Sequence, residues 1–108
     1  MRKSDVYKWL KRYSEDKIYF TKKAKIRCRQ RKIPEKLIRD NLLSPIKMIH
    51  VKEEDQPNPN EYKFKLYFKI SNVQTLCVRL TLNEKIKIIT TYIIINKLQK
   101  GMWLKWKK

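Results

Sequence analysis

Three cations stand four residues apart along one stretch of the sequence. Lys23, Arg27 and Arg31 have the spacing that places side chains one above another on a helix, and no acidic residue stands between them. Arginine binds phosphate through two parallel hydrogen bonds, whereas lysine binds it as a point charge. Such a column is suited to holding a phosphate, or to neutralising the charge that builds up on a phosphate during a metal-independent reaction.

The cations around this column make a strongly positive segment. Residues 17–39 contain ten Lys or Arg and one acid, Glu35, whereas four of the ten acids of the chain fall within residues 53–61. The tail 97–108 has five Lys and no acid. This separation of signs predicts one positive face, for which we expect these nucleic-acid contacts beside the column: Lys22, Lys25, Arg29, Lys32, Trp103 and Lys105. The alternative is a solvated helix whose lysines only keep the protein soluble.

The composition of the whole chain supports an anionic partner. The 108 residues have 28 Lys+Arg against 10 Asp+Glu, for a formal net charge of +18, and 42% of them are hydrophobic, which predicts a folded basic domain. The inventory of one His, two Cys and one Gly excludes a zinc site and a glycine-rich phosphate loop, so no metal or cofactor is expected. Neither a membrane span nor a signal peptide is predicted, and we expect a cytoplasmic protein.

The hydrophobic pattern predicts how these residues are positioned. Helical spacing is expected over residues 5–14, 22–32 and 34–43. Ser4, Thr21 and Pro34 are expected to begin these helices, and Ser44 and Pro45 to end the third. Strand-like segments follow at 46–51, 62–70, 75–82 and 85–96, and the acidic stretch 52–60 is expected to be an exposed loop. From Tyr62 to Ile70, apolar residues alternate with Lys63, Lys65, Tyr67 and Lys69, which predicts one apolar and one basic face. Short turns between successive strands require antiparallel neighbours. The prediction is an α+β domain with the helices on one face of a roughly four-stranded antiparallel sheet.

Three residues on the later strands complete the candidate site. Tyr92 is suited to proton transfer or to stacking on a base, although filling the core is an equal alternative for a strand aromatic. Arg79 on the neighbouring strand would add a phosphate contact. Thr91 is a further candidate, for which ordinary β-propensity is the simpler explanation. His50 is interpreted as a surface residue.

One segment resembles a known protein family. Residues Phe20–Ile33 are similar to the opening of a family of small uncharacterised proteins related to RelE/ParE-type toxins and to the barnase/colicin-type ribonuclease fold, with Thr21, Ala24, Arg27, Arg31 and Ile33 at matching positions. The end of the third helix at Ser44-Pro45 and the segment Ile88–Tyr92 are also similar to that family, so the resemblance covers about 18–96. The main departure is Lys23, which stands where the family has His.

The resemblance implies a RelE/ParE-like core at 18–96, with an added N-terminal helix at 1–17 and a basic Trp-rich tail at 97–108, all within one domain. It also implies RNA in preference to DNA as the partner, and a toxin-type, metal-independent endoribonuclease with Lys23, Arg27, Arg31 and Tyr92 as catalytic residues. Two alternatives remain open at this point. One is a non-catalytic nucleic-acid-binding protein, and the other is a module that binds an acidic protein such as an antitoxin.

Overall fold

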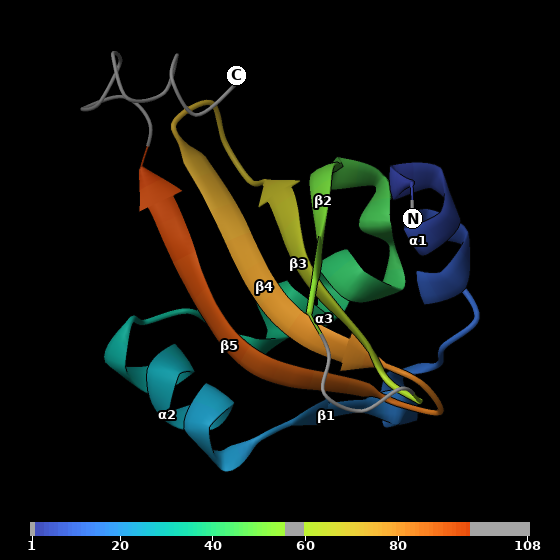
Figure 1. The fold of residues 1–108 in the computed structure, drawn as a ribbon. Helices are drawn as coiled ribbons and strands as arrows, with labels where there is room; N and C mark the ends of the chain where they lie inside the picture. The colour runs from blue at the N-terminus through green and yellow to red at the C-terminus, as the bar shows by residue number, and fades with distance from the viewer. Residues whose placement is uncertain (1, 56–59, 96–108) are drawn as a thin grey trace.

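The computed structural model describes residues 2–55 and 60–95, and it combines helices with one sheet (Figure 1). The helices are α1 (Lys3–Leu10), α2 (Lys22–Gln30) and α3 (Glu35–Leu43), with short 3-10 turns η1 (Glu15–Lys17) and η2 (Pro45–Lys47). The strands are β1 (Ile18–Phe20), β2 (Met48–Glu54), β3 (Tyr62–Lys69), β4 (Gln74–Leu82) and β5 (Ile86–Ile95). The predicted α+β class is therefore confirmed.

The sheet has five strands and is mixed, so the prediction of four antiparallel strands is wrong. Strands β2 to β5 form the expected antiparallel meander, and β1 adds to β5 in parallel, giving the order β1-β5-β4-β3-β2. The missed strand β1 has three residues, too few to show a period, and its exposed central residue is the apolar Tyr19. Arg39 on α3 holds this strand, because its guanidinium lies 4.9 Å from the ring centre of Phe20.

One face of the sheet is covered by helices and the other is open. Alternate residues of β3 and β4, such as Leu66 and Val78, belong to the hydrophobic core together with residues of all three helices, among them Val6, Ala24 and Ile38. Thr75, Cys77 and Thr81, on the other face of β4, are buried as well. Figure 1 shows α3 behind the long strands, on the side away from the viewer. The opposite face holds the alternate residues of β3, which are Lys63, Lys65, Tyr67 and Lys69. The alternation read from the sequence therefore gave both faces of this strand correctly.

A β-bulge decides which residues of β5 reach the open face. Leu80 pairs with Ile88 whereas Arg79 pairs with Thr90, so Ile89 is an extra residue in the ladder. Because side chains alternate along a strand, one extra residue exchanges the two faces beyond it. Ile88 thus lies in the core, and Tyr92 comes to the open face opposite Cys77.

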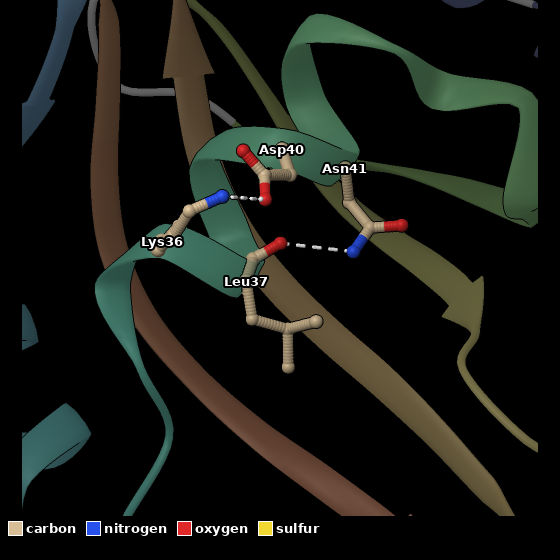
Figure 2. A network of polar contacts seen from close by, with 4 residues as sticks. All are labelled: Lys36, Leu37, Asp40 and Asn41. Carbon is tan, nitrogen blue, oxygen red and sulfur yellow. Dashed lines mark hydrogen bonds and ion pairs between the residues drawn. The ribbon is translucent and has the colours of Figure 1, made fainter.

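Helices α2 and α3 lie close to the expected residues, whereas α1 is shifted toward the N-terminus and ends at Leu10, not at residue 14. The first helix begins at Lys3, not after Ser4, because the Asp5 carboxylate accepts a hydrogen bond from the backbone N–H of Arg2 at 3.2 Å and closes the first turn there. Helix α2 ends at Gln30, before the predicted Lys32. Helix α3 carries its own polar contacts: Lys36 binds Asp40 at 2.8 Å, and the Asn41 amide donates to the Leu37 carbonyl at 2.9 Å (Figure 2).

The first helix is also more than an addition to the core. Val6 and Leu10 are fully buried in the single hydrophobic cluster, and the Trp9 ring packs edge-on against Tyr62 at 5.0 Å. At the end of this segment, the Tyr13 hydroxyl donates to the Asn83 carbonyl in the β4–β5 turn at 2.6 Å. Residues 2–13 are thus part of the folded unit.

The prediction of an acidic loop at 52–60 is wrong for residues 52–54. Lys52, Glu53 and Glu54 belong to β2 and pair with Lys65, Phe64 and Lys63 of β3. Charged residues are tolerated here because β2 is an edge strand with one open face, so their side chains reach water or a partner. Residues 56–59 lie outside the described part of the chain.

Within the described residues, no helix is both long enough and apolar enough to cross a membrane.

Candidate nucleic-acid interface

Helix α2 presents most of the predicted cations to solvent. The Thr21 hydroxyl begins it by accepting the N–H of Ala24 at 3.1 Å, and only Ala24 and Cys28 of the helix are buried. Its other positions are cationic or polar apart from Ile26, and these cations are exposed: Lys22, Lys23, Lys25 and Arg29. Lys32, just beyond the helix, is exposed as well. The helix therefore offers a positive outer surface.

A tight turn ends α2 and sets the position of Arg31. Lys32 has a φ of 54°, and the N–H of Ile33 returns to the Cys28 carbonyl at 2.9 Å. This is the Schellman arrangement, in which the residue after the cap is left-handed. Arg31 is the cap itself.

The predicted column Lys23–Arg27–Arg31 is divided in the structure. Lys23 is exposed, and Arg27 donates to the Gln30 side chain on its own helix at 3.2 Å. Arg31 instead reaches β5, where its Nη1 donates to the Thr91 carbonyl at 2.6 Å and its guanidinium lies 5.9 Å from the Tyr92 ring centre. The structure thus brings Arg31, Thr91 and Tyr92 together, as candidates from two distant segments.

Thr91 takes part only through its backbone. Its side chain is fully buried, and its hydroxyl donates to the Cys77 carbonyl at 3.0 Å inside the sheet. The Thr91 hydroxyl therefore cannot contact a ligand in the folded sheet, and the prediction of such a contact is wrong. Thr91 instead positions Arg31 through its backbone carbonyl.

Aromatic side chains from three strands line up across the open face. His50 on β2 is opposite Tyr67 on β3, Tyr67 is opposite Cys77 on β4, and Cys77 is opposite Tyr92 on β5. The His50 and Tyr67 rings are 5.3 Å apart. Tyr67 is 6% exposed, Tyr92 is half-buried, and His50 is exposed.

Lys65 occupies the space between the two tyrosines. Its Nζ lies 5.8 Å from the Tyr67 ring centre and 5.3 Å from that of Tyr92. Together with Arg31 it completes what we call the cation–aromatic row: Arg31, Tyr92, Lys65, Tyr67 and His50. Cations within about 6 Å of an aromatic ring are attracted to its face.

The pKa values of Lys65 and its neighbours keep a positive charge at the centre of the row. A hydrogen bond to Tyr92 is the main cause that raises the pKa of Lys65 above its ordinary value, and burial opposes it. Burial raises the pKa of the Tyr67 phenol and raises that of the Cys77 thiol to about 11. At neutral pH the cluster therefore holds the Lys65 ammonium beside a neutral phenol and a neutral thiol.

Two cations of the sheet outside the row, Arg79 and Lys87, have carboxylate partners. Glu54 accepts two hydrogen bonds from Arg79, at 3.0 and 3.2 Å, so the positive charge of this predicted phosphate contact is compensated. Glu61 lies 3.8 Å from Lys87. Among the described residues neither Arg31 nor Lys65 has a carboxylate partner, and both contact tyrosines instead. The row is thus a part of the described sheet where positive charge has no carboxylate beside it.

Sequence reasoning missed three members of the row: Lys65, Tyr67 and His50. The alternation of β3 placed Lys65 and Tyr67 on its basic face, but only the cross-strand register shows that they meet Tyr92. Trp103 and Lys105 lie outside the described residues.

No match for the chain was found among protein-family models, among curated proteins or among solved structures. The resemblance to RelE/ParE-type proteins therefore remains a prediction. No group of three or more His, Cys, Asp or Glu suited to a metal ion occurs in the described part of the chain.

Proposed function

We propose that this protein binds RNA through the open face of its sheet and the adjoining cations of α2. The observation that carries the proposal is the convergence of two cations on one tyrosine. Arg31 comes from beyond the edge of β5 and Lys65 from β3, and both lie within 6 Å of the Tyr92 ring centre. Two uncompensated cations beside a phenol offer a phosphate two charge-assisted hydrogen bonds.

The charge of the chain supports a polyanion as the ligand. With a net charge of +18, the protein attracts phosphate backbones at long range, and the row gives them a place to bind. The resemblance of Phe20–Ile33 to a ribonuclease-like family makes RNA the first polyanion to test, and a RelE/ParE-like fold and a cytoplasmic location belong to the same proposal.

The test is binding of a labelled RNA, followed by fluorescence anisotropy. The variant Arg31→Gln/Lys65→Gln removes the two cations of the row, and Lys8→Gln/Lys36→Gln removes two exposed cations from α1 and α3, which cover the other face. Both double variants have the same net charge. We expect the first to lose at least about tenfold in affinity and the second to lose much less, because local contacts add to the general field.

Two results would overturn the proposal. Equal losses in the two double variants would mean that only net charge matters. No binding of RNA at low salt, with tight binding of an acidic protein that weakens as salt is added, would favour the partner-binding alternative.

Endoribonuclease activity is a second candidate, favoured by the contact between Arg31 and Tyr92. These two predicted catalytic residues lie together, and with Lys65 they offer the positive charge that a cleaving phosphate needs. The raised pKa of Lys65 suits charge stabilisation and not proton removal. Incubation of RNA with the protein in EDTA tests this role. Cleavage by the wild-type protein that is lost in Arg31→Gln would support it. If the RNA stays intact, the endoribonuclease role is excluded and only the binding function remains. The same assay on Lys23→Ala/Arg27→Ala tests the helix candidates.

A further inference from the structure

The open face combines cations with aromatic rings, and this combination bears on the form of RNA that it takes. We propose that the row binds unpaired RNA, with a base stacked on the Tyr92 ring and the neighbouring phosphates on Arg31 and Lys65. This inference rests on the proposed RNA binding and specifies its substrate class as single-stranded RNA.

A duplex makes little use of aromatic side chains. Its bases are stacked on one another, so it offers a protein mainly phosphates, 2′-hydroxyls and base edges. A surface for duplex RNA therefore needs cations and polar groups but no rings. Sites for single strands instead interleave cations with rings on which unpaired bases stack. The row has this second composition, since cations and rings alternate from Arg31 to Tyr67.

The position of Tyr92 suits a stacked nucleotide. Its ring is half-buried, and two cations lie at 5.3 and 5.9 Å from the ring centre. A nucleotide that stacks there brings its own phosphates toward these cations. A charge-assisted hydrogen bond to phosphate is stronger than a cation–π contact at a partly exposed site, so Lys65 turns from the ring to a phosphate and uncovers the ring face. Arg31 stays on the Thr91 carbonyl and offers its remaining N–H groups to a second phosphate.

The register of the β-strands gives the RNA a path across the sheet. His50 is the other accessible ring of the row, and it lies three strands from Tyr92, which corresponds to about 14 Å at the usual spacing. Tyr67, between them, is 6% exposed and supports Lys65 and His50. A single strand that crosses from β5 to β2 therefore meets Tyr92 first and His50 several nucleotides later.

The experiment compares three RNAs of about 12 nucleotides, a length within the usual site size of single-strand binding folds. They are a single strand, the duplex of that strand with its complement, and the single strand with its central bases removed but its phosphates kept. The wild-type protein should bind the first at least about tenfold more tightly than the other two at equal salt.

Variants at Tyr92 locate the effect. Tyr92→Leu should lose most of the preference for the intact single strand, whereas Tyr92→Phe keeps a ring and should keep the preference. Tyr19→Leu is the matched control, because Tyr19 is a 56% exposed strand tyrosine outside the row. It should retain wild-type selectivity. If Tyr92→Leu fails to fold, as judged by circular dichroism, the base-free RNA tests stacking with the wild-type protein alone.

The outcomes separate this inference from the function on which it rests. Equal affinity for all three RNAs, or equal selectivity in Tyr92→Leu and Tyr92→Phe when both fold, would overturn the inference and leave RNA binding intact. Failure to bind any of the three would overturn the proposed function itself.

Discussion

Arg31 Nη1 donates to the carbonyl oxygen of Thr91 at 2.6 Å, across 60 residues of sequence. Thr91 lies beyond Ile86–Ile88, the part of β5 that pairs with β1, so this bond covers a carbonyl at a sheet edge where no described strand pairs. Edges of this kind otherwise invite pairing with another chain. The same bond fixes the guanidinium beside Tyr92. One contact therefore protects the edge and builds the candidate site.

Removing a carboxylate from the open face should strengthen RNA binding. Glu54→Gln releases Arg79 from its two hydrogen bonds and leaves a further uncompensated cation on the sheet. We expect affinity for RNA to rise by about threefold or more at low salt, and the gain to shrink as salt screens the added charge. Asp40→Asn, which frees Lys36 on α3, is the matched control. An equal rise in both variants would refute a specific role for the open face.

The turn after α2 contains removable backbone strain. Lys32 has a φ of 54°, a conformation that favours glycine. Lys32→Gly should therefore raise the free energy of unfolding by about 1 kcal/mol, measured by urea denaturation. Lys25→Gly, inside α2, should lower it by about 1 kcal/mol. Destabilisation by both substitutions would contradict the left-handed assignment at Lys32.

The first helix should be essential for stability. Leu10 is fully buried in the common core, so Leu10→Ala should cost about 2–5 kcal/mol of unfolding free energy, whereas exposed Lys11→Ala should change it little. Chemical denaturation of both variants checks this. A loss below about 0.5 kcal/mol for Leu10→Ala would mean that α1 is a dispensable addition.

The buried thiol of Cys77 should make stability fall in alkali. Its pKa is raised from 9.0 to about 11 by burial, so on raising the pH the unfolded chain loses this proton first. The contribution is fully present below pH 9 and is lost toward pH 11, by about 3 kcal/mol at most. Unfolding measured between pH 8 and pH 10 should show a decline that is smaller in Cys77→Ala. If the decline is unchanged in Cys77→Ala, the loss of stability does not come from the Cys77 thiol. Burial also raises the pKa of the Cys28 thiol, so the variant Cys28→Ala measures how much of the decline comes from that second cysteine.

Local patterns in the sequence were sufficient for most of the fold. The alternation from Tyr62 to Ile70 identified β3 and its two faces, and Thr21 and Pro34 marked the starts of α2 and α3. Strand β1 was not predicted, because three residues are too few to show a period. Its pairing with β5 joins residues almost 70 positions apart in the sequence. Such a contact has no local signal.

The candidate site was predicted only in part, for the same reason. Helical spacing grouped Arg31 with Lys23 and Arg27, but the helix stops at Gln30 and Arg31 turns to β5. The bulge at Ile89 that brings Tyr92 to the open face has no sequence signature, and neither does the register that sets Lys65 beside it. The charge of the segment predicted a binding surface, whereas the geometry of the row depends on tertiary pairing.

The most direct test of the account is the salt dependence of RNA affinity. Wild-type protein and the Arg31→Gln/Lys65→Gln variant are titrated with the same single-stranded RNA at several salt concentrations, with Lys8→Gln/Lys36→Gln as control. On a single strand each phosphate contact contributes about 0.7 to the slope of log affinity against log salt, so loss of two contacts should reduce the slope by about 1.4. The control should keep the wild-type slope. Identical slopes for all three proteins would show that Arg31 and Lys65 do not bind phosphate, and would contradict the account.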